Sequence, residues 1–202
     1  MSIKAVLFDM GKVLVHFNFD PAFKRLARHC RRSPEQIRAF FASSELEVLY
    51  DGGKISSRRF YREVKRGLGF SLTYAQFERL WNGIFTPVPG MAALVHRLGR
   101  SHRLVLLSNT NAMHFKHIKK RYPVLKKFHR HVLSYKEKVR KPDERIYRAA
   151  LKACRAKAHE VVYIDDREDL TSAAKELGFH IHTFKNDRPV LEKLLRKHGV
   201  LK

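Results

Sequence analysis

Four short polar segments lie far apart along the chain, and each stands directly after an apolar run or before a predicted helix. They begin at Asp9, Ser108, Lys141 and Asp165. Asp9 follows the apolar run that ends at Phe8, and the flexible Gly11 stands two positions later. A carboxylate held at the end of a strand can act as a nucleophile or bind a cation.

Two of the segments offer groups that suit an anion. Ser108 and Asn109 follow the apolar residues 103–107 and provide hydroxyl, amide and backbone N–H donors at a helix start. Lys141 is followed by Pro142, which fixes the turn so that the ammonium group can point back toward the strand ends. Each segment taken alone also fits an ordinary helix N-cap or a solvated helix start.

The fourth segment is an acidic pair. Asp165 and Asp166 follow the apolar residues 161–164, and two adjacent carboxylates repel each other unless a cation such as Mg²⁺ holds them. The alternative is a pair of acids at a helix N-terminus, which the helix dipole favours. A carboxylate such as Asp9 can attack phosphorus only when a divalent ion and a lysine such as Lys141 cancel the repulsion between anions.

The pattern of apolar runs indicates how these segments are positioned. Short runs at residues 3–8, 103–107, 161–164 and 180–184 predict buried parallel strands. Helical patterns alternate with them at residues 91–98, 112–120, 144–154, 170–177 and 189–198. Strands alternating with helices predict an α/β fold with a doubly wound parallel sheet, and such sheets place their chemistry at the carboxyl ends of the strands.

The stretch from residue 16 to residue 86 breaks this alternation, because it offers only amphipathic helices. Ser33 and Thr73 are predicted N-caps, each with a glutamine three positions later. We therefore expect a helical cap over residues 16–86, inserted after the first strand, and a catalytic core formed by residues 1–15 and 87–202.

Composition narrows the classes of protein. The 202 residues are 44% hydrophobic, which is enough for a packed core and excludes a disordered chain. Cys30 and Cys154 form no metal or redox motif, and the first residues lack the uncharged core of a signal peptide or membrane span. These features favour a soluble cytoplasmic protein, although they leave the oligomeric state open.

The net charge of +23 favours anionic partners but does not identify them. Residues 114–141 contain eleven Lys or Arg residues and one acid, Glu137. One interpretation is a nucleic-acid surface with Phe115, Tyr122, Phe128 and Tyr135 as stacking aromatics. We favour the alternative, in which these aromatics face the core of helices whose other side is solvated. Electrostatic steering of a small phosphorylated substrate is the third possibility.

The order of the four segments resembles the haloacid-dehalogenase-like (HAD) hydrolase superfamily. FDMGKV, LLSNT, RKPDERIY and YIDD match its four motifs across nearly the whole chain. The chain is most similar to bacterial sugar-phosphate phosphatases and to the phosphatase domain of soluble epoxide hydrolases. The resemblance implies a Rossmann-like core with a small helical cap, and a magnesium-dependent phosphatase that proceeds through an aspartyl-phosphate.

The resemblance also implies roles for individual residues. Asp9 would be the nucleophile, and it would bind Mg²⁺ together with Asp166 and the main-chain carbonyl of Gly11. Asp165 would orient Asp166 or a metal-bound water.

The remaining motif residues would contact the phosphoryl group. Ser108 and Asn109 would hold its oxygens. Lys141 would neutralise charge on both the phosphoryl group and the nucleophile.

The chain departs from the family pattern at two positions. The family usually has a second Asp, a general acid and base, where this sequence has Gly11. His16 could replace that acid, but we favour the alternative that His16 only begins the cap and that water or the leaving group's own acidity suffices. Leu170 stands where near relatives carry Asn, and Asp169 could take the place of that residue.

Two other functions compete with the phosphatase. A haloacid dehalogenase would share Asp9, Ser108, Asn109 and Lys141, but it needs no metal and usually lacks the acidic pair. A catalytically impaired HAD fold could instead bind nucleic acid or another polyanion through its basic face. Desolvation of its buried charges would then cost free energy without any catalytic need for them, which argues against this function.

Overall fold

A five-stranded parallel sheet forms the centre of the protein. The computed structural model describes residues 2–202, and the sheet has the strand order β5-β4-β1-β6-β7. The strands are β1 (Ala5–Phe8), β4 (Arg103–Ser108), β5 (Arg130–Leu133), β6 (Val161–Asp165) and β7 (His180–Thr183). The predicted doubly wound α/β sheet is therefore confirmed.

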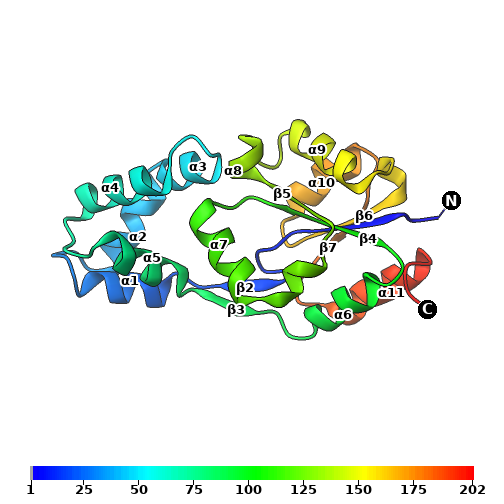
Figure 1. The fold of residues 1–202 in the computed structure, drawn as a ribbon, viewed down its shortest axis with the longest axis horizontal. Coiled ribbons are helices and arrows are strands. Elements are labelled where there is room, and N and C mark those ends of the chain that lie inside the picture. Colours follow the sequence, from blue (N-terminus) through cyan, green and yellow to red (C-terminus); the bar gives the residue numbers. More distant parts are fainter. Residues whose placement is uncertain (1) are drawn as a thin grey trace.

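Helices cover both faces of the sheet (Figure 1). One face carries α6 (Met91–Leu98), α7 (Ala112–Arg121) and α11 (Arg188–Lys197), and the other carries α9 (Glu144–Cys154) and α10 (Glu168–Glu176). Shorter elements are the 3₁₀ helices η1 (Pro123–Lys127) and η2 (Ala158–Glu160) and the one-turn helix α8 (Ser134–Glu137). The bounds of α6, α7, α9, α10 and α11 agree closely with those of the five predicted helices.

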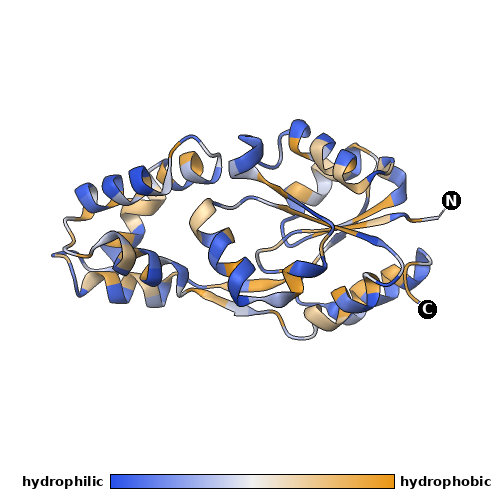
Figure 2. Cartoon of the chain, in the orientation of Figure 1, coloured by the Kyte–Doolittle hydropathy of each residue, from blue (hydrophilic) through white to orange (hydrophobic). Residues whose placement is uncertain are grey.

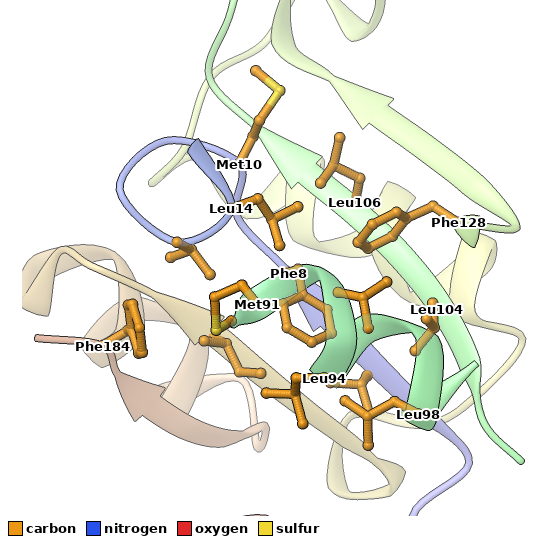
Figure 3. Close-up of a cluster of buried hydrophobic side chains, with 14 of the residues drawn as sticks. Phe8, Met10, Leu14, Met91, Leu94, Leu98, Leu104, Leu106, Phe128 and Phe184 are labelled. Atoms are coloured by element: carbon orange, nitrogen blue, oxygen red, sulfur yellow. The ribbon is translucent and has the colours of Figure 1, made fainter. Parts of the chain in front are cut away.

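Strand β1 shows why its short apolar run forms a central strand. Successive side chains of a strand point to opposite faces, so Val6 and Phe8 enter one hydrophobic cluster and Ala5 and Leu7 the other. All four are fully buried. Figure 3 shows Phe8 surrounded by apolar side chains from α6, β4 and the segment after β1. Burial on both faces is typical of a parallel sheet.

Five further helices lie beyond the carboxyl ends of the strands, at the left of Figure 1. They are α1 (Asp20–Ala27), α2 (Pro34–Ser43), α3 (Leu46–Asp51), α4 (Ser57–Leu68) and α5 (Tyr74–Asn82). Both predicted capping boxes, at Ser33 and Thr73, are confirmed. The five helices pack around a largely aromatic cluster of their own, in which Phe23 stacks on Phe41 at 5.6 Å between ring centroids. In Figure 2 their outward sides are mostly hydrophilic.

Three strands lie outside the predicted set. A short antiparallel ribbon of β2 (Val15–Phe17) and β3 (Phe85–Pro87) connects these five helices to the sheet, where the sequence indicated only helices. Strand β5 extends the sheet within the basic stretch, and the sequence analysis did not predict it. Its residues Arg130 and His131 interrupt the apolar pattern, so only Val132 and Leu133 are buried.

Of the four aromatic residues of the basic stretch, two are buried, and Tyr122 and Tyr135 are half-buried against the same cluster. Phe115 and Phe128 are buried in the cluster under the sheet, and the hydroxyl of Tyr122 donates to the carbonyl oxygen of Phe85 at 2.9 Å. This confirms the interpretation that Phe115 and Phe128 are core residues, so neither ring is free to stack on nucleic-acid bases.

No helix within residues 2–202 combines the length and the apolar character that a membrane span requires.

Candidate active site

A buried lysine joins the carboxyl ends of the central strands. The Nζ atom of Lys141 donates to Asp9 Oδ1 at 2.8 Å, to Asp165 Oδ2 at 2.5 Å and to the carbonyl oxygen of Leu107 at 3.2 Å, and it lies 3.1 Å from the hydroxyl of Tyr163. Burial alone would lower the pKa of Lys141, but the charges of Asp9 and Asp165 raise it above its ordinary value. The ammonium group is therefore a fixed positive charge between two carboxylates.

The register of the sheet explains why residues so distant in sequence meet here. Phe8 of β1 pairs with Leu106 of β4 and with Ile164 of β6, so Asp9 emerges beside the ends of both neighbouring strands. Parallel strands end at the same edge, which brings Ser108 and Asp165 to the same place. The sheet itself therefore brings three of the four segments together, and Lys141 reaches them from the loop between α8 and α9.

Asn109 holds the loop that carries Lys141. Its side-chain Nδ2 donates to the carbonyl oxygen of Lys141 at 3.0 Å, and the Lys141 backbone N–H donates to Asn109 Oδ1 at 2.8 Å. An amide nitrogen has two hydrogens, so one remains to bind an anion. Asn109 thus has a positioning contact that the sequence did not indicate, in addition to its expected place beside Ser108.

Three carboxylates gather at this edge. Asp9, Asp165 and Asp166 each offer an oxygen within 4.8 Å of the others. Both oxygens of Asp165 are already engaged, because Oδ2 accepts from Lys141 and from the Tyr163 hydroxyl, and Oδ1 accepts from the Arg167 backbone N–H at 2.9 Å. Asp9 and Asp166 are therefore better placed than Asp165 to bind a metal.

The electrostatics of the cluster fit a divalent cation. Burial, opposed by the charge of Lys141 and reinforced by the charge of Asp165, raises the pKa of Asp9 to about 7. Burial and the same neighbour also raise the pKa of Asp166. The nearby Lys12 is largely exposed, and its Nζ lies 3.7 Å from Asp166. An excess of negative charge thus surrounds a set of oxygen ligands, which is the environment that Mg²⁺ binds.

A cavity of about 420 Å³ opens above these residues, between the sheet and the five helices α1–α5. Its lining includes every residue that the sequence analysis assigned to the site: Asp9, Gly11, Ser108, Asn109, Lys141, Asp165 and Asp166. The structure therefore brings all of them together.

The cavity is also lined by residues that were not predicted from the sequence. Glu47 and Asp51 contribute from α3, Trp81 from α5, His114 from α7 and Arg140 from the loop before Lys141. The spacing of Glu47 and Asp51, one helical turn apart, was the only sequence signal for these residues.

Helix α3 is fixed against the starts of α7 and α8 by polar contacts. The hydroxyl of Ser134 donates to the carbonyl oxygen of Asp51 at 2.5 Å, and the side-chain Nδ2 of Asn111 donates to Asp51 Oδ1 at 3.0 Å. The backbone N–H of Met113 donates to the hydroxyl of Tyr50 at 3.1 Å. These contacts fix the position of α3 in the cavity wall.

Neither His16 nor Asp169, the residues considered as a substitute acid and a substitute for the missing Asn, lines the cavity. Val15 and Phe17 line the cavity, and His16 between them does not, because side chains of a strand alternate between its faces. Asp169 does not line the cavity either; its exposed carboxylate accepts from the guanidinium group of Arg167.

The space beside Gly11 belongs to an aromatic ring. A Cβ atom at position 11 would lie 3.0 Å from Cε1 of Phe17 and 3.7 Å from Oδ2 of Asp9. The ring of Phe17 thus occupies the place into which a longer side chain at position 11 would project.

Comparison with known proteins identifies clear relatives. A family model described as haloacid dehalogenase-like hydrolase matches residues 3–178. D-ribitol-5-phosphate phosphatase of Bacteroides thetaiotaomicron is 25% identical over 185 residues, which cover 88% of this chain and 89% of that protein. Sesquiterpene phosphatase astK of Aspergillus oryzae is 27% identical over 180 residues, covering 88% of this chain and 87% of that protein.

A solved structure extends the similarity to three dimensions. The HAD family enzyme bt-2542 of Bacteroides thetaiotaomicron, in complex with magnesium and inorganic phosphate, superposes with a TM-score of 0.83. The two chains are 25% identical, and the match covers 92% of this chain and 96% of the other.

Proposed function

Because this chain belongs to the haloacid dehalogenase-like hydrolases, we propose that it is a magnesium-dependent phosphatase that hydrolyses a small phosphorylated metabolite. The observation that carries the proposal is the buried Lys141 held between Asp9 and Asp165, with Asp166 beside them and a cavity above. Relatives named as phosphatases, and a similar structure that holds magnesium and phosphate, support the same reaction class.

Asp9 is the nucleophile in this proposal. One of its carboxylate oxygens attacks phosphorus, the bond from phosphorus to the ester oxygen breaks, and an aspartyl-phosphate forms. Lys141 reduces the repulsion between the carboxylate and the phosphoryl oxygens, because its ammonium group already contacts Asp9. Water then hydrolyses the aspartyl-phosphate and regenerates Asp9.

Other residues orient the phosphoryl group and the metal. The hydroxyl of Ser108 and the remaining amide hydrogen of Asn109 donate to phosphoryl oxygens. Asp9, Asp166 and the main-chain carbonyl of Gly11 hold Mg²⁺, while Asp165 stays bonded to Lys141 and Tyr163. When bound, the metal supplies positive charge that draws the substrate's phosphoryl oxygens toward the nucleophile.

The helices over residues 16–86 act as a cap domain on a core of residues 1–15 and 87–202. Their role is to exclude bulk water while Asp9 reacts and to select the leaving group. Because Gly11 carries no acid, the leaving oxygen takes its proton from water. The predicted cytoplasmic location accords with a metabolite as substrate.

Hydrolysis of p-nitrophenyl phosphate by the purified protein tests this proposal. We expect turnover that requires Mg²⁺, stops with EDTA and returns when Mg²⁺ is restored. Asp9→Asn should lose activity at least about 1,000-fold, since an amide is a poor nucleophile and a weaker metal ligand. Turnover that persists in EDTA, or halide release from a 2-haloacid without phosphate release from any ester, would contradict the proposal.

A further inference from the structure

A second concave site lies at the end of the five helices α1–α5 that points away from the sheet. A groove of about 610 Å³ is formed by the link between α1 and α2 and by the end of α4 with the link to α5. These two links meet at the left end of Figure 1, where the backbone N–H of Ser71 donates to the carbonyl oxygen of His29 at 3.1 Å. The groove shares no lining residue with the cavity above Asp9, so it is separate from the candidate active site.

Four arginines and no acid line this groove. Arg28, Arg31 and Arg32 lie on the link after α1, and Arg66 lies in the last turn of α4. The first three are exposed and form no ion pair with any carboxylate in the described part of the chain. Arg66 pairs with Glu63, whose carboxylate does not line the groove. Four like charges around one concave surface repel one another, and their combined field favours an anion there.

The need of helix ends for positive charge does not explain these arginines. Cationic side chains near a helix C-terminus commonly bind its unpaired carbonyl groups. Arg25 of α1 makes such a contact, because its Nη2 donates at 3.1 Å to the carbonyl oxygen of Gly83 at the end of α5. The guanidinium groups of Arg28, Arg31 and Arg32, in contrast, donate to no carbonyl oxygen of residues 2–202. They are therefore available to a ligand from outside the chain.

The lining of the groove selects the class of anion. A guanidinium group presents parallel N–H donors that match the oxygens of a phosphate group. No Phe, Tyr or Trp among the described residues lines the groove, so a nucleic-acid base finds no ring on which to stack. Leu68 is the one large apolar side chain in the described lining, and it is buried, so a peptide or a lipid surface finds no apolar anchor. A compact chain of phosphate groups needs neither a ring nor an apolar pocket.

We propose that this groove binds a ligand with several adjacent phosphate groups, either a free polyphosphate chain or the triphosphate of a nucleotide, through the guanidinium groups of Arg28, Arg31, Arg32 and Arg66. The exposed hydroxyl of Ser71 adds a further donor to the groove. The inference does not depend on the proposed phosphatase function, because the groove and the candidate active site have no residue in common.

Isothermal titration calorimetry of the full chain with tripolyphosphate tests the inference. The buffer contains EDTA, so that no metal ion links the ligand to the candidate active site, and about 100 mM salt, which screens non-specific attraction. We expect tripolyphosphate and ATP to bind with affinities within about 10-fold of each other, and inorganic phosphate to bind at least about 10-fold more weakly than tripolyphosphate, because a single phosphate contacts fewer guanidinium groups. A larger preference for ATP, or tighter binding of a single-stranded oligonucleotide than of tripolyphosphate, would overturn the inference.

Two pairs of substitutions locate the site. Arg31→Gln combined with Arg32→Gln should weaken tripolyphosphate binding at least about 10-fold, because two guanidinium contacts to phosphate are lost. Arg59→Gln combined with Arg62→Gln is the matched control: both are exposed arginines of α4, neither lines the groove, and the net charge changes by the same amount. The control should keep the wild-type affinity within about twofold.

The comparison separates a specific site from the general attraction of a strongly basic protein. An equal loss of affinity in both pairs would attribute binding to the net charge of +23 and overturn the inference. Wild-type affinity in the Arg31 and Arg32 pair would overturn it too, because the ligand would then bind elsewhere. All four substituted arginines are exposed, so both variants should unfold at the wild-type temperature, and thermal denaturation checks this.

Discussion

His114 should make the stability of the fold depend on pH below neutrality. The side chain is buried, its Nδ1 lies 3.0 Å from Asn82 Oδ1, and its ring stacks on Trp81 at 5.8 Å between centroids. Burial, together with the charge of the neighbouring His117, lowers the pKa of His114 to about 3. The imidazole is therefore neutral in the folded protein at any pH above about 3.

The size of this pH effect on the free energy of unfolding follows from the difference between the pKa of His114 in the folded and in the unfolded protein. An unfolded histidine has a pKa of about 6.5, so between pH 6.5 and 3 the unfolded chain binds a proton at His114 that the folded chain does not. Stability from this group is complete above pH 6.5 and falls as the pH falls, by about 1.4 kcal/mol for each pH unit. Between pH 7 and pH 5 the loss amounts to about 2 kcal/mol.

Urea unfolding at pH 7 and pH 5 measures this effect when the wild type is compared with His114→Gln. Glutamine does not titrate and can still bond Asn82, whereas all other titrating groups are common to both proteins. The free energy of unfolding should fall about 2 kcal/mol further in the wild type than in the variant. An identical pH dependence in the two proteins would refute the assignment of a neutral, buried His114.

Two other predictions follow from contacts and charge. Tyr163→Phe removes the hydroxyl between Lys141 and Asp165 and should lower the free energy of unfolding by about 1–3 kcal/mol, because the buried Asp165 carboxylate loses a donor. Urea denaturation measures this change, and an unchanged midpoint would show that the hydroxyl contributes nothing to stability. Raising the salt concentration from 20 to 200 mM should lower kcat/KM for a phosphate ester and leave kcat nearly unchanged, because salt screens the attraction between the net charge of +23 and a dianionic substrate. Steady-state kinetics measure both constants, and an unchanged kcat/KM would exclude electrostatic steering.

The core motifs were predictable because one geometric rule places them. Asp9, Ser108 and Asp165 each end an apolar strand, and parallel strands end at one edge. Sequence order and a helix start were enough to add Lys141. The chemistry of this edge therefore follows from the local pattern and the fold class.

The substrate side of the cavity was not predictable in the same way. Glu47 and Trp81 lie on different helices, and their meeting in one cavity depends on how the five helices pack and dock through contacts such as that of Asp51 with Asn111. The orientation of side chains in a very short strand was not predictable either. In β2, Val15 and Phe17 face the cavity, so His16 between them faces away, and a strand of three residues is too short for its alternation to be recognised in the sequence.

The contact between Phe17 and position 11 couples the side chains that the two positions can hold. A Cβ at position 11 would lie 3.0 Å from Cε1 of Phe17, so aspartate there fits once the ring has shifted by a few tenths of an ångström. Because Phe17 is 39% exposed, the hydrophobic core does not lock its ring in place. A general acid at position 11 is thus one substitution and one small side-chain movement away from the present sequence.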